Sequence, residues 1–463
     1  MYFEQFYLTC LAHASYMIGS EGEAAVVDPQ RDVDIYLEAA EEQGLKIRHI
    51  FETHLHADFV SGHKELAART GAKIYIGAQA NAGFPHTPLR DGSEVKMGTV
   101  RIRALETPGH TPESICLVVT DEDKSTQPWG VLTGDTLFIG DVGRPDLSPQ
   151  HTPQELAGLL YDSLHQKVLR LPDATLVYPA HGAGSLCGRN MRAERSSTIG
   201  TERLTNYALQ IGSRAEFIQQ LTSNLPARPG YFLQDAEINR SGAEALTDRP
   251  PLRELTLAEL QTLLSQKANV VDVRPPEQFA AGHIAGSINI ALSGQFATWA
   301  GTILGLGSKP VLVAETDAQV KEAALRMSRV GIEDIRGYLS GEITAWQKVG
   351  LPLTVTAQIS AEDLHKKLHG KSIQVLDVRR LGEWQAGHIE QATNRALDNF
   401  PQELPAVDDS QPLAIHCKSG YRSMIACSLL ERAGHRNIFN VIGGYDAWHA
   451  AGLPESAEQL VKA

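Results

Sequence analysis

The chain has 463 residues, of which 42% are hydrophobic and 21% charged, a composition typical of globular proteins and long enough for about three domains. Its 42 basic and 55 acidic residues give a net charge of −13, so we expect neither nucleic acid nor an anionic membrane as a partner. No apolar run reaches the roughly 18 residues of a transmembrane helix, the N-terminus lacks a secretory pattern, and the five scattered cysteines do not indicate disulfides. We therefore expect a cytoplasmic protein.

The N-terminal region alternates short β-branched runs with amphipathic segments, a pattern typical of an α/β fold. Strands are expected over residues 24–28, 72–77, 100–105 and 131–133, and helices over 32–43 and 63–69. Ser213 followed by Glu216 predicts the start of a further helix. The adjacent Pro250 and Pro251 predict a domain boundary, because two prolines stop both helix and strand. We take residues 1–250 as the first domain.

Histidine and aspartate residues recur in turns that follow the predicted strands of this domain. They are His54, His56, Asp58, His110, Asp135 and His181. The first three stand at every second position of Thr53–Phe59, and the others each adjoin a glycine. Imidazole nitrogens and carboxylate oxygens are common metal ligands, so this pattern predicts a metal site.

The arrangement resembles the metallo-β-lactamase fold, whose HxHxDH signature is followed by separate His, Asp and His ligands. One position departs from the two-metal members, because Phe59 stands where they carry the last histidine of the signature. A phenyl ring has no lone pair to donate. The departure favours a site with one metal.

Among one-metal members the chain most resembles the persulfide dioxygenases. That resemblance implies one Fe(II) per chain, held by His54, His110 and Asp135 as a 2-His-1-carboxylate triad with open positions. His56, Asp58 and His181 would then orient ligands or water, or bind a second metal as in two-metal relatives. The resemblance also implies dioxygen and a small thiol persulfide, of the glutathione or coenzyme A type, as substrates.

Two further residues are candidates for binding the substrate. Arg144, in a segment that resembles the family after its Asp ligand, could meet a substrate carboxylate or a developing oxyanion; a structural role is the alternative. Cys187, six residues beyond His181, could hold a persulfide near the metal, or be a plain thiol. The apolar surroundings of Cys10, Cys116 and Cys427 predict packing roles.

The remainder of the chain repeats itself at offsets of 102 to 105 residues. Four motifs recur in order: 256–259 as 360–363, 270–274 as 375–379, 281–284 as 386–389, and 345–352 as 447–454. We therefore expect two tandem domains, over residues 251–355 and 356–463.

In the last domain, Cys417 follows a predicted strand and opens a helix. A thiol at a helix N-terminus, near Lys418 and Arg422, is expected to ionise readily and to carry a persulfide. Four residues separate Cys417 from Arg422, one fewer than in phosphatases that hold phosphate in a similar loop, and the shorter loop favours a single sulfur atom. This domain resembles the rhodaneses, which implies that Cys417 and Arg422 are catalytic and that the loop Lys418, Ser419, Gly420, Tyr421 and Ser423 binds sulfur.

The middle domain resembles the same family without its nucleophile. Glu315 stands where Cys417 stands, and the loop that follows has neither cysteine, glycine nor arginine. We expect a catalytically inactive rhodanese.

Together these features predict an α/β chain with an N-terminal metallo-β-lactamase αββα sandwich and two rhodanese α/β domains. The expected function is persulfide oxidation to sulfite, coupled to a rhodanese step that forms or uses thiosulfate. The alternatives are a two-metal thioester hydrolase of the glyoxalase II type and a non-enzymatic sulfur carrier or sensor. A homo-oligomer is expected.

Overall fold

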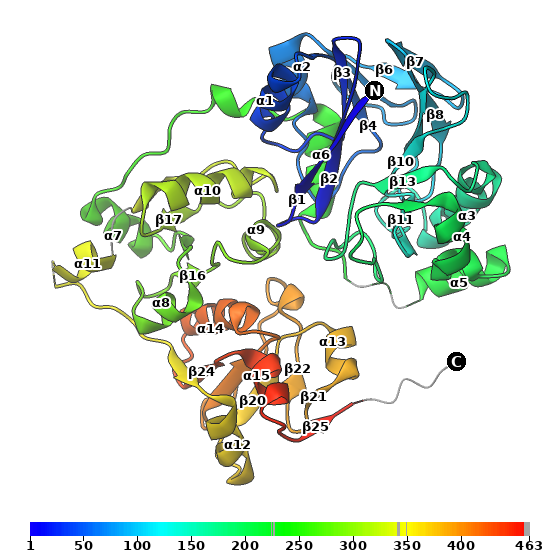
Figure 1. The fold of residues 1–463 in the computed structure, drawn as a ribbon. Helices are drawn as coiled ribbons and strands as arrows, with labels where there is room; N and C mark the ends of the chain where they lie inside the picture. Colours follow the sequence, from blue (N-terminus) through cyan, green and yellow to red (C-terminus); the bar gives the residue numbers. More distant parts are fainter. Residues whose placement is uncertain (224, 226, 340–342, 349, 458–463) are drawn as a thin grey trace. The chain divides into compact units, whose positions relative to one another are not determined.

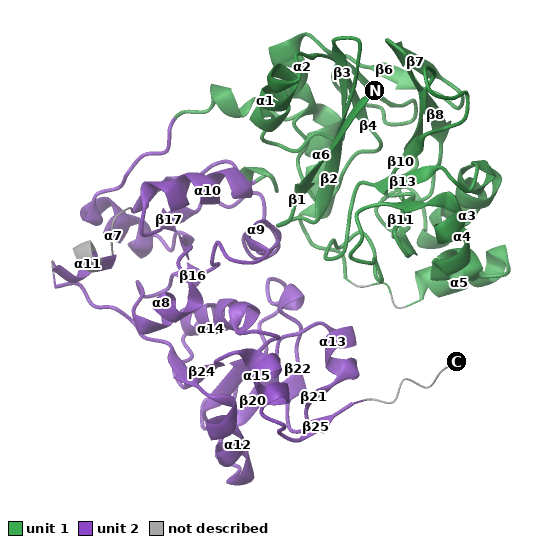
Figure 2. Cartoon of the chain, viewed as in Figure 1, with its two compact units in different colours: residues 1–250, 328–331 green, residues 251–327, 332–463 purple. Residues whose placement is uncertain are grey.

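The computed structural model describes residues 1–457 except 224, 226, 340–342 and 349, so parts of both predicted rhodanese domains lie outside it. The chain divides into two compact units between Pro250 and Pro251. Residues 328–331 belong to the first unit, and the second comprises 251–327 and 332–463 (Figure 2). Within the described residues, no helix has both the length and the apolar character needed to cross a membrane.

The first unit contains two six-stranded sheets (Figure 1). The first sheet has the order β1 (Tyr2–Leu8), β2 (His13–Ser20), β3 (Glu23–Val27), β4 (Lys46–Glu52), β5 (Lys73–Gly77) and β6 (Thr87–Leu89). The second has the order β14 (Ser197–Thr198), β13 (Leu176–Pro179), β10 (Gly130–Gly134), β9 (Ile115–Asp121), β8 (Val100–Glu106) and β7 (Glu94–Met97). A two-stranded ribbon, β11 (Leu137–Phe138) and β12 (Asp141–Val142), follows β10.

Helices cover the outer face of each sheet. They are α1 (Asp34–Glu42), α2 (His63–Thr70), α3 (Pro153–Gln166), α4 (Ile199–Thr205), α5 (Arg214–Thr222) and α6 (Phe232–Ser241), with short 3-10 helices at Val168–Arg170, Tyr207–Gln210 and Leu246–Asp248. Tyr36 of α1 packs with Val26 and Ile50 of the first sheet, and Leu160 of α3 packs with Val118 of the second. Phe51 and Leu117, from the two sheets, share a third core between them. The unit is therefore a helix–sheet–sheet–helix sandwich.

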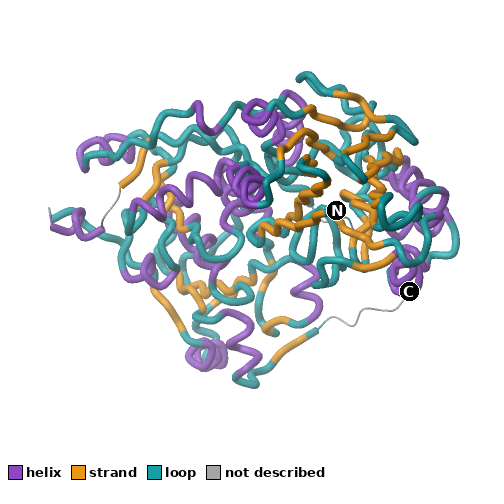
Figure 3. Tube along the Cα trace, turned by 45° about the horizontal axis from the view of Figure 1, so that its top comes forward, coloured by secondary structure: helices purple, strands orange, loops and turns teal. Residues whose placement is uncertain are grey.

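The second unit contains two parallel sheets, each interleaved with helices along the chain. Figure 3 colours helices purple and strands orange along the whole trace. The sheet of the middle domain has the order β16 (Ile288–Asn289), β15 (Val270–Asp272), β17 (Val311–Val313) and β18 (Gly337–Leu339). Its helices are α7 (Leu257–Ser265), α8 (Pro276–Ala281), α9 (Phe296–Leu304), α10 (Asp317–Ser328) and α11 (Ile343–Lys348).

The sheet of the last domain has the order β19 (Ala357–Ile359), β24 (Ile438–Val441), β23 (Leu413–His416), β20 (Gln374–Asp377) and β22 (Thr393–Asn394). A small pair joins β21 (His388–Ile389) and β25 (Glu455–Ser456). The helices are α12 (Ala361–His369), α13 (Leu381–Ala386), α14 (Tyr421–Ala433) and α15 (Gly444–Ala450), with a 3-10 turn at Leu397–Asn399.

The two halves of the sequence repeat make the same side-chain contacts in the structure. Arg274 donates from Nη2 to Asp272, 2.6 Å away, and Arg379 makes the same 2.6 Å contact with Asp377. The indole nitrogen of Trp346 lies 3.0 Å from the Pro352 carbonyl oxygen, and that of Trp448 lies 3.0 Å from the carbonyl of Pro454. Two copies of one domain plan therefore make up the second unit.

The local expectations from the sequence are confirmed. Every predicted strand and helix of the N-terminal region is present, with ends shifted by one or two residues. Thr256 and Ser360 cap α7 and α12, and Ser213 caps α5, because short side-chain oxygens accept the free N–H groups of a first turn. The packing role is wrong for Cys10, which is partly exposed, whereas Cys116 and Cys427 are buried.

Candidate functional site

Three predicted ligands meet in the first unit. His54 follows β4, His110 lies in the turn after β8, and Asp135 follows β10. Their ligand atoms lie within 4.8 Å of one another, and all three side chains are buried. The Oδ2 atom of Asp135 is 3.3 Å from His110 Nε2 and 3.8 Å from His54 Nε2.

Hydrogen bonds set which nitrogen of each histidine faces this group. The Thr53 hydroxyl donates to Asp28 at 2.9 Å, so it accepts from His54 Nδ1 at 3.0 Å. His110 Nδ1 donates to the main-chain carbonyl of Arg144 at 2.9 Å. Both Nε2 atoms therefore carry lone pairs that point toward Asp135.

These atoms fit a metal ion. His54 Nε2, His110 Nε2 and both Asp135 oxygens are buried without a hydrogen-bond partner, which is costly unless something else satisfies them. Burial, with the nearby His56, lowers the pKa of His54 well below its ordinary value. Burial also lowers the pKa of His110, although Asp135 opposes the shift. The two imidazoles are neutral, as metal ligation requires.

A second buried group contains His56, Asp58 and His181, whose ligand atoms also lie within 4.8 Å of one another. His181 Nε2 is 3.4 Å from Asp58 and 3.7 Å from Asp135. The Phe59 ring packs beside this group, with its centroid 4.4 Å from that of His56. An apolar ring, with no atom that can bind a metal, thus lies against this group.

Two carboxylates flank His56. Its Nε2 lies 3.2 Å from Asp28 and 3.4 Å from Glu52. Burial opposes charge on His56, but Asp28 and Glu52 outweigh it and raise the pKa of His56 well above its ordinary value. Two carboxylates this close to Nε2 favour a proton on that nitrogen, so this arrangement favours His54, His110 and Asp135 as the metal group.

Sequence reasoning missed three residues around these groups. Asn239 of α6 donates to the carbonyl oxygens of His56, at 2.8 Å, and Phe59, at 2.7 Å, and so holds the ligand loop. Glu113 accepts from the Leu55 N–H at 3.0 Å. His13 of β2 is buried, and its ring lies tilted against that of Phe59 with the centroids 4.1 Å apart; neither ring nitrogen has a hydrogen-bond partner. No motif in the sequence marked His13.

Cys187 lies against the metal group. Its thiol, Asp135 and His181 form a further set within 4.8 Å, and the side chain is buried. Burial, then Asp58 and Asp135, raise the pKa of Cys187 well above its ordinary value, so without a cation it is a thiol. The Cys187 carbonyl accepts from the Arg144 N–H at 3.0 Å, which ties the two loops together.

Arg144 is engaged within the protein. Its guanidinium makes two bonds to Asp146, at 2.6 and 2.8 Å, and a third to the Leu186 carbonyl. Its backbone holds His110, as described above. These bonds hold the Arg144 side chain against its own loop, and its substrate-binding role stays a prediction.

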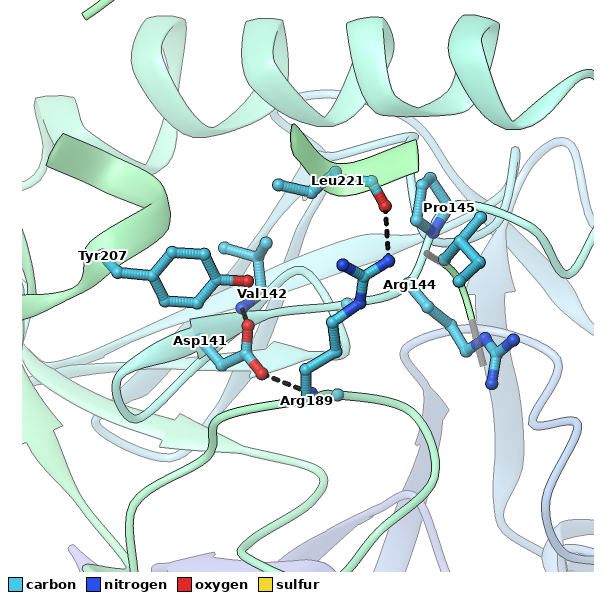
Figure 4. Close-up of a pocket in the computed structure, with 10 residues that line it drawn as sticks. Asp141, Val142, Arg144, Pro145, Arg189, Tyr207 and Leu221 are labelled. Carbon is cyan, nitrogen blue, oxygen red and sulfur yellow. Dashed lines mark hydrogen bonds between the residues drawn. The ribbon is translucent and has the colours of Figure 1, made fainter. Parts of the chain in front are cut away.

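A small pocket lies beside these loops (Figure 4). Arg189 crosses it and donates to the Leu221 carbonyl at 2.8 Å, while Asp141 accepts from the Arg189 N–H at 2.5 Å. Gly143 separates the pocket from the metal group, and a Cβ atom there would collide with the Asp135 carbonyl and lie 2.9 Å from His110 Nδ1. The close approach of this loop to the ligands requires glycine.

The sulfur loop of the last domain is built as a cradle. Cys417 is buried at the end of β23, and the Gly420 N–H donates to its sulfur at 3.1 Å. Gly420 has a φ of +99°, a conformation that favours glycine. The N-terminus of α15 secures the loop, since the Tyr445 N–H donates to the Cys417 carbonyl at 2.8 Å.

Other predicted loop residues lie around the thiol. Arg422 forms two 2.7 Å bonds with Glu383 of α13, a partner that the sequence did not indicate. The hydroxyl of Ser423 lies 3.5 Å from Cys417 Sγ and 2.6 Å from Asn440 Oδ1. Lys418 is exposed and lies 3.6 Å from Asp446.

In the matching loop of the middle domain, the side chain of Gln319 occupies the backbone N–H groups. The Gln319 side-chain oxygen accepts from the N–H groups of Glu315, at 2.9 Å, and Thr316, at 3.3 Å. Backbone donors that would cradle an anion are thus already occupied. With no thiol at this position, the described loop has no sulfur carrier.

Comparison with known proteins agrees with this architecture. The model of the metallo-beta-lactamase superfamily matches residues 8–181, and that of the rhodanese-like domain matches 256–349 and 360–451. The crystal structure of a metallo-beta-lactamase from Staphylococcus aureus superposes with a TM-score of 0.67 at 33% identity, over 74% of this chain and 99% of that one. The chain belongs to the metallo-β-lactamase superfamily. Its fold is the predicted one, a metallo-β-lactamase domain followed by two rhodanese-like domains.

Two curated relatives align with the metallo-β-lactamase domain. The mitochondrial persulfide dioxygenase ETHE1 of Bos taurus is 29% identical over 220 residues, 46% of this chain and 77% of that protein. The hydroxyacylglutathione hydrolase of a Polaromonas species is 34% identical over 163 residues, 35% of this chain and 57% of that enzyme. These similarities indicate an enzyme with a metal cofactor.

Proposed function

We propose that the metallo-β-lactamase domain is an iron-dependent persulfide dioxygenase. One observation carries the proposal: His54 Nε2, His110 Nε2 and Asp135 converge, buried and unpartnered, in the triad typical of non-haem iron. The similarity to persulfide dioxygenases supports the same assignment. One iron per chain is proposed, because Phe59 and the acid-paired His56 leave the second group short of ligands.

In the proposed reaction a thiol persulfide, dioxygen and water give the free thiol and sulfite. Bound Fe(II) would supply the activation of dioxygen. The chain's own groups hold the ligands in place: Thr53 and the Arg144 carbonyl fix the tautomers of His54 and His110. The buried Cys187 offers a sulfur contact for the substrate beside Asp135. The persulfide is of the glutathione or coenzyme A type.

The last domain would exchange sulfane sulfur with sulfite. The Cys417 thiolate attacks the outer sulfur of a persulfide, and the free thiol leaves. Sulfite then takes that sulfur from Cys417, which gives thiosulfate and restores the thiolate. The same steps run in reverse would make a persulfide from thiosulfate. The Gly420 N–H, which donates to the Cys417 sulfur, would stabilise negative charge there, and Arg422 would add a positive charge.

The two activities together suit a role in sulfide detoxification. The protein is proposed to be a cytoplasmic homo-oligomer without nucleic-acid or membrane partners. The second candidate is a thioester hydrolase of the glyoxalase II type, which needs two metals. The convergence of His56, Asp58 and His181 favours it, as does the hydroxyacylglutathione hydrolase similarity. Phe59 and the carboxylates around His56 count against it.

The deciding experiment is oxygen uptake by the iron-loaded full chain with glutathione persulfide, with product analysis. We expect one dioxygen consumed per sulfite formed. Where that sulfite goes on to thiosulfate, two persulfides are consumed per dioxygen. Hydrolysis of a glutathione thioester without oxygen uptake would instead establish the second candidate.

A further inference from the structure

The middle domain contacts the sulfur loop of the last domain, although it has no nucleophile of its own. The Tyr421 hydroxyl donates to the main-chain carbonyl of Ala291 at 2.9 Å. Tyr421 lies inside the loop, between Gly420, which donates to the Cys417 sulfur, and Arg422, which pairs with Glu383. A single side chain thus links the reactive loop to the neighbouring domain.

The contacting segment, residues 291–294, fits closely around Tyr421. Gly294 has a φ of +78°, and a Cβ atom there would lie 3.5 Å from the Tyr421 ring. Burial raises the pKa of Tyr421, so the hydroxyl keeps the proton that it donates. In the repeat, this segment corresponds to residues 396–399, which follow β22 in the last domain.

Arg326 of α10 holds this segment in place. Its Nη1 donates to the Leu292 carbonyl at 2.6 Å, and the Leu292 N–H donates to Val273 at 3.0 Å. A further bond ties β16 to α14, because the Asn289 N–H donates to the Ser428 hydroxyl at 3.1 Å. Strand β16 and helix α14 lie side by side within the second unit (Figure 2).

We propose that the inactive middle domain positions the sulfur loop of the last domain through the bond between Tyr421 and Ala291. Tyr421 is then a positioning residue for Cys417, and Arg326 acts on the loop from the other domain. This inference rests on the proposed sulfur transfer. It assigns the middle domain a task that needs no nucleophile.

The test uses the full chain with Tyr421→Phe and Arg326→Ala. Matched controls are Tyr338→Phe, a tyrosine elsewhere in the middle domain, and Glu322→Ala, which breaks the ion pair of Arg326 with Glu322 but leaves the bond to Leu292. Sulfur transfer from thiosulfate and alkylation of Cys417 by iodoacetamide are both measured. Thermal midpoints show that each variant is folded.

Each test variant should lower kcat for sulfur transfer roughly two- to tenfold, the usual effect of one hydrogen bond, with KM for thiosulfate unchanged. Alkylation of Cys417 should slow by a similar factor. The double variant should fall no further than Tyr421→Phe alone, because both changes act through one contact. The two controls should match wild type.

Wild-type kinetics in both test variants would overturn the inference, and so would additive losses in the double variant. A wild-type chain that transfers no sulfur would instead refute the proposed function, and the positioning role with it. A loss in Tyr421→Phe without one in Arg326→Ala would show that the loop needs its tyrosine but not the middle domain.

Discussion

The Nδ1 atom of His110 lies 2.9 Å from the main-chain carbonyl oxygen of Arg144, nine residues after Asp135. The bond leaves His110 Nε2 free to face Asp135 at 3.3 Å. Because the acceptor is a backbone carbonyl, it fixes the tautomer of His110 whichever side chain stands at position 144. The metal group therefore depends on the path of this loop as well as on its own side chains.

The group of His54, His110 and Asp135 predicts how much metal the protein binds. Asp135→Ala removes the only carboxylate of the triad, so we expect loss of iron and of oxygen uptake. Wild type should carry about one iron per chain and little zinc. Asp58→Ala is the matched control, because Asp58 belongs to the second group; it should retain iron. The metal content of each protein is measured after it has been loaded with iron. Two metals per chain, or full activity with zinc alone, would contradict the one-iron site.

Stability should fall in acid partly through His13. Burial, then His181, lower the pKa of His13 well below its ordinary value, so the unfolded chain binds this proton first as pH falls. The folded state then loses up to about 1.4 kcal/mol per pH unit below about pH 6.5. His13→Gln should therefore reduce the drop in urea midpoint between about pH 7.5 and pH 5.5.

The partly exposed His86 provides the control for that measurement. His86→Gln lies in the same unit but outside both metal groups, so the midpoint should keep its wild-type pH dependence. An unchanged slope in His13→Gln would show that His13 accepts its proton in the folded protein.

Glu315→Ala should leave oxygen uptake and sulfur transfer near wild type. Glu315 is exposed, and its loop donors already bond to Gln319. Both rates are measured on the full chain. A collapse of sulfur transfer in a folded variant would give this loop a function that we have not assigned.

Cys417→Ser tests whether the two sites form one pathway. A serine hydroxyl cannot carry a persulfide, while the metal group, in another domain, should be untouched. The variant should consume oxygen with glutathione persulfide but release sulfite, where wild type releases mostly thiosulfate. Sulfite and thiosulfate are distinguished by derivatising the products with a thiol-reactive reagent.

The converse variant is His110→Ala. It should lose oxygen uptake, yet still make thiosulfate when sulfite and persulfide are both supplied. If Cys417→Ser made thiosulfate at the wild-type rate, the coupling would fail and Cys187 would be the next thiol to test.

The parts of the site that the sequence predicts are those encoded in short motifs. His54, His56 and Asp58 stand within five residues, and Cys417 and Arg422 within six, so spacing alone groups them. Asn239 reaches the ligand loop across 183 residues, and Tyr421 reaches Ala291 across 130. Only folding brings such residues together. Residue type alone also does not tell which partner a side chain binds. The bonds from Arg144 to Asp146 depend on the shape of their loop.

The filled loop of the middle domain bears on how this repeat could change over evolutionary time. Glu315→Cys would restore a thiol, but the Gln319 oxygen would still hold the N–H groups of residues 315 and 316. No residue of that loop would supply the flexibility of Gly420 or the charge of Arg422. We therefore expect Glu315→Cys alone to give no sulfur-transfer activity. We expect instead that sulfur transfer in this domain would require several substitutions at once, in the loop and at Gln319.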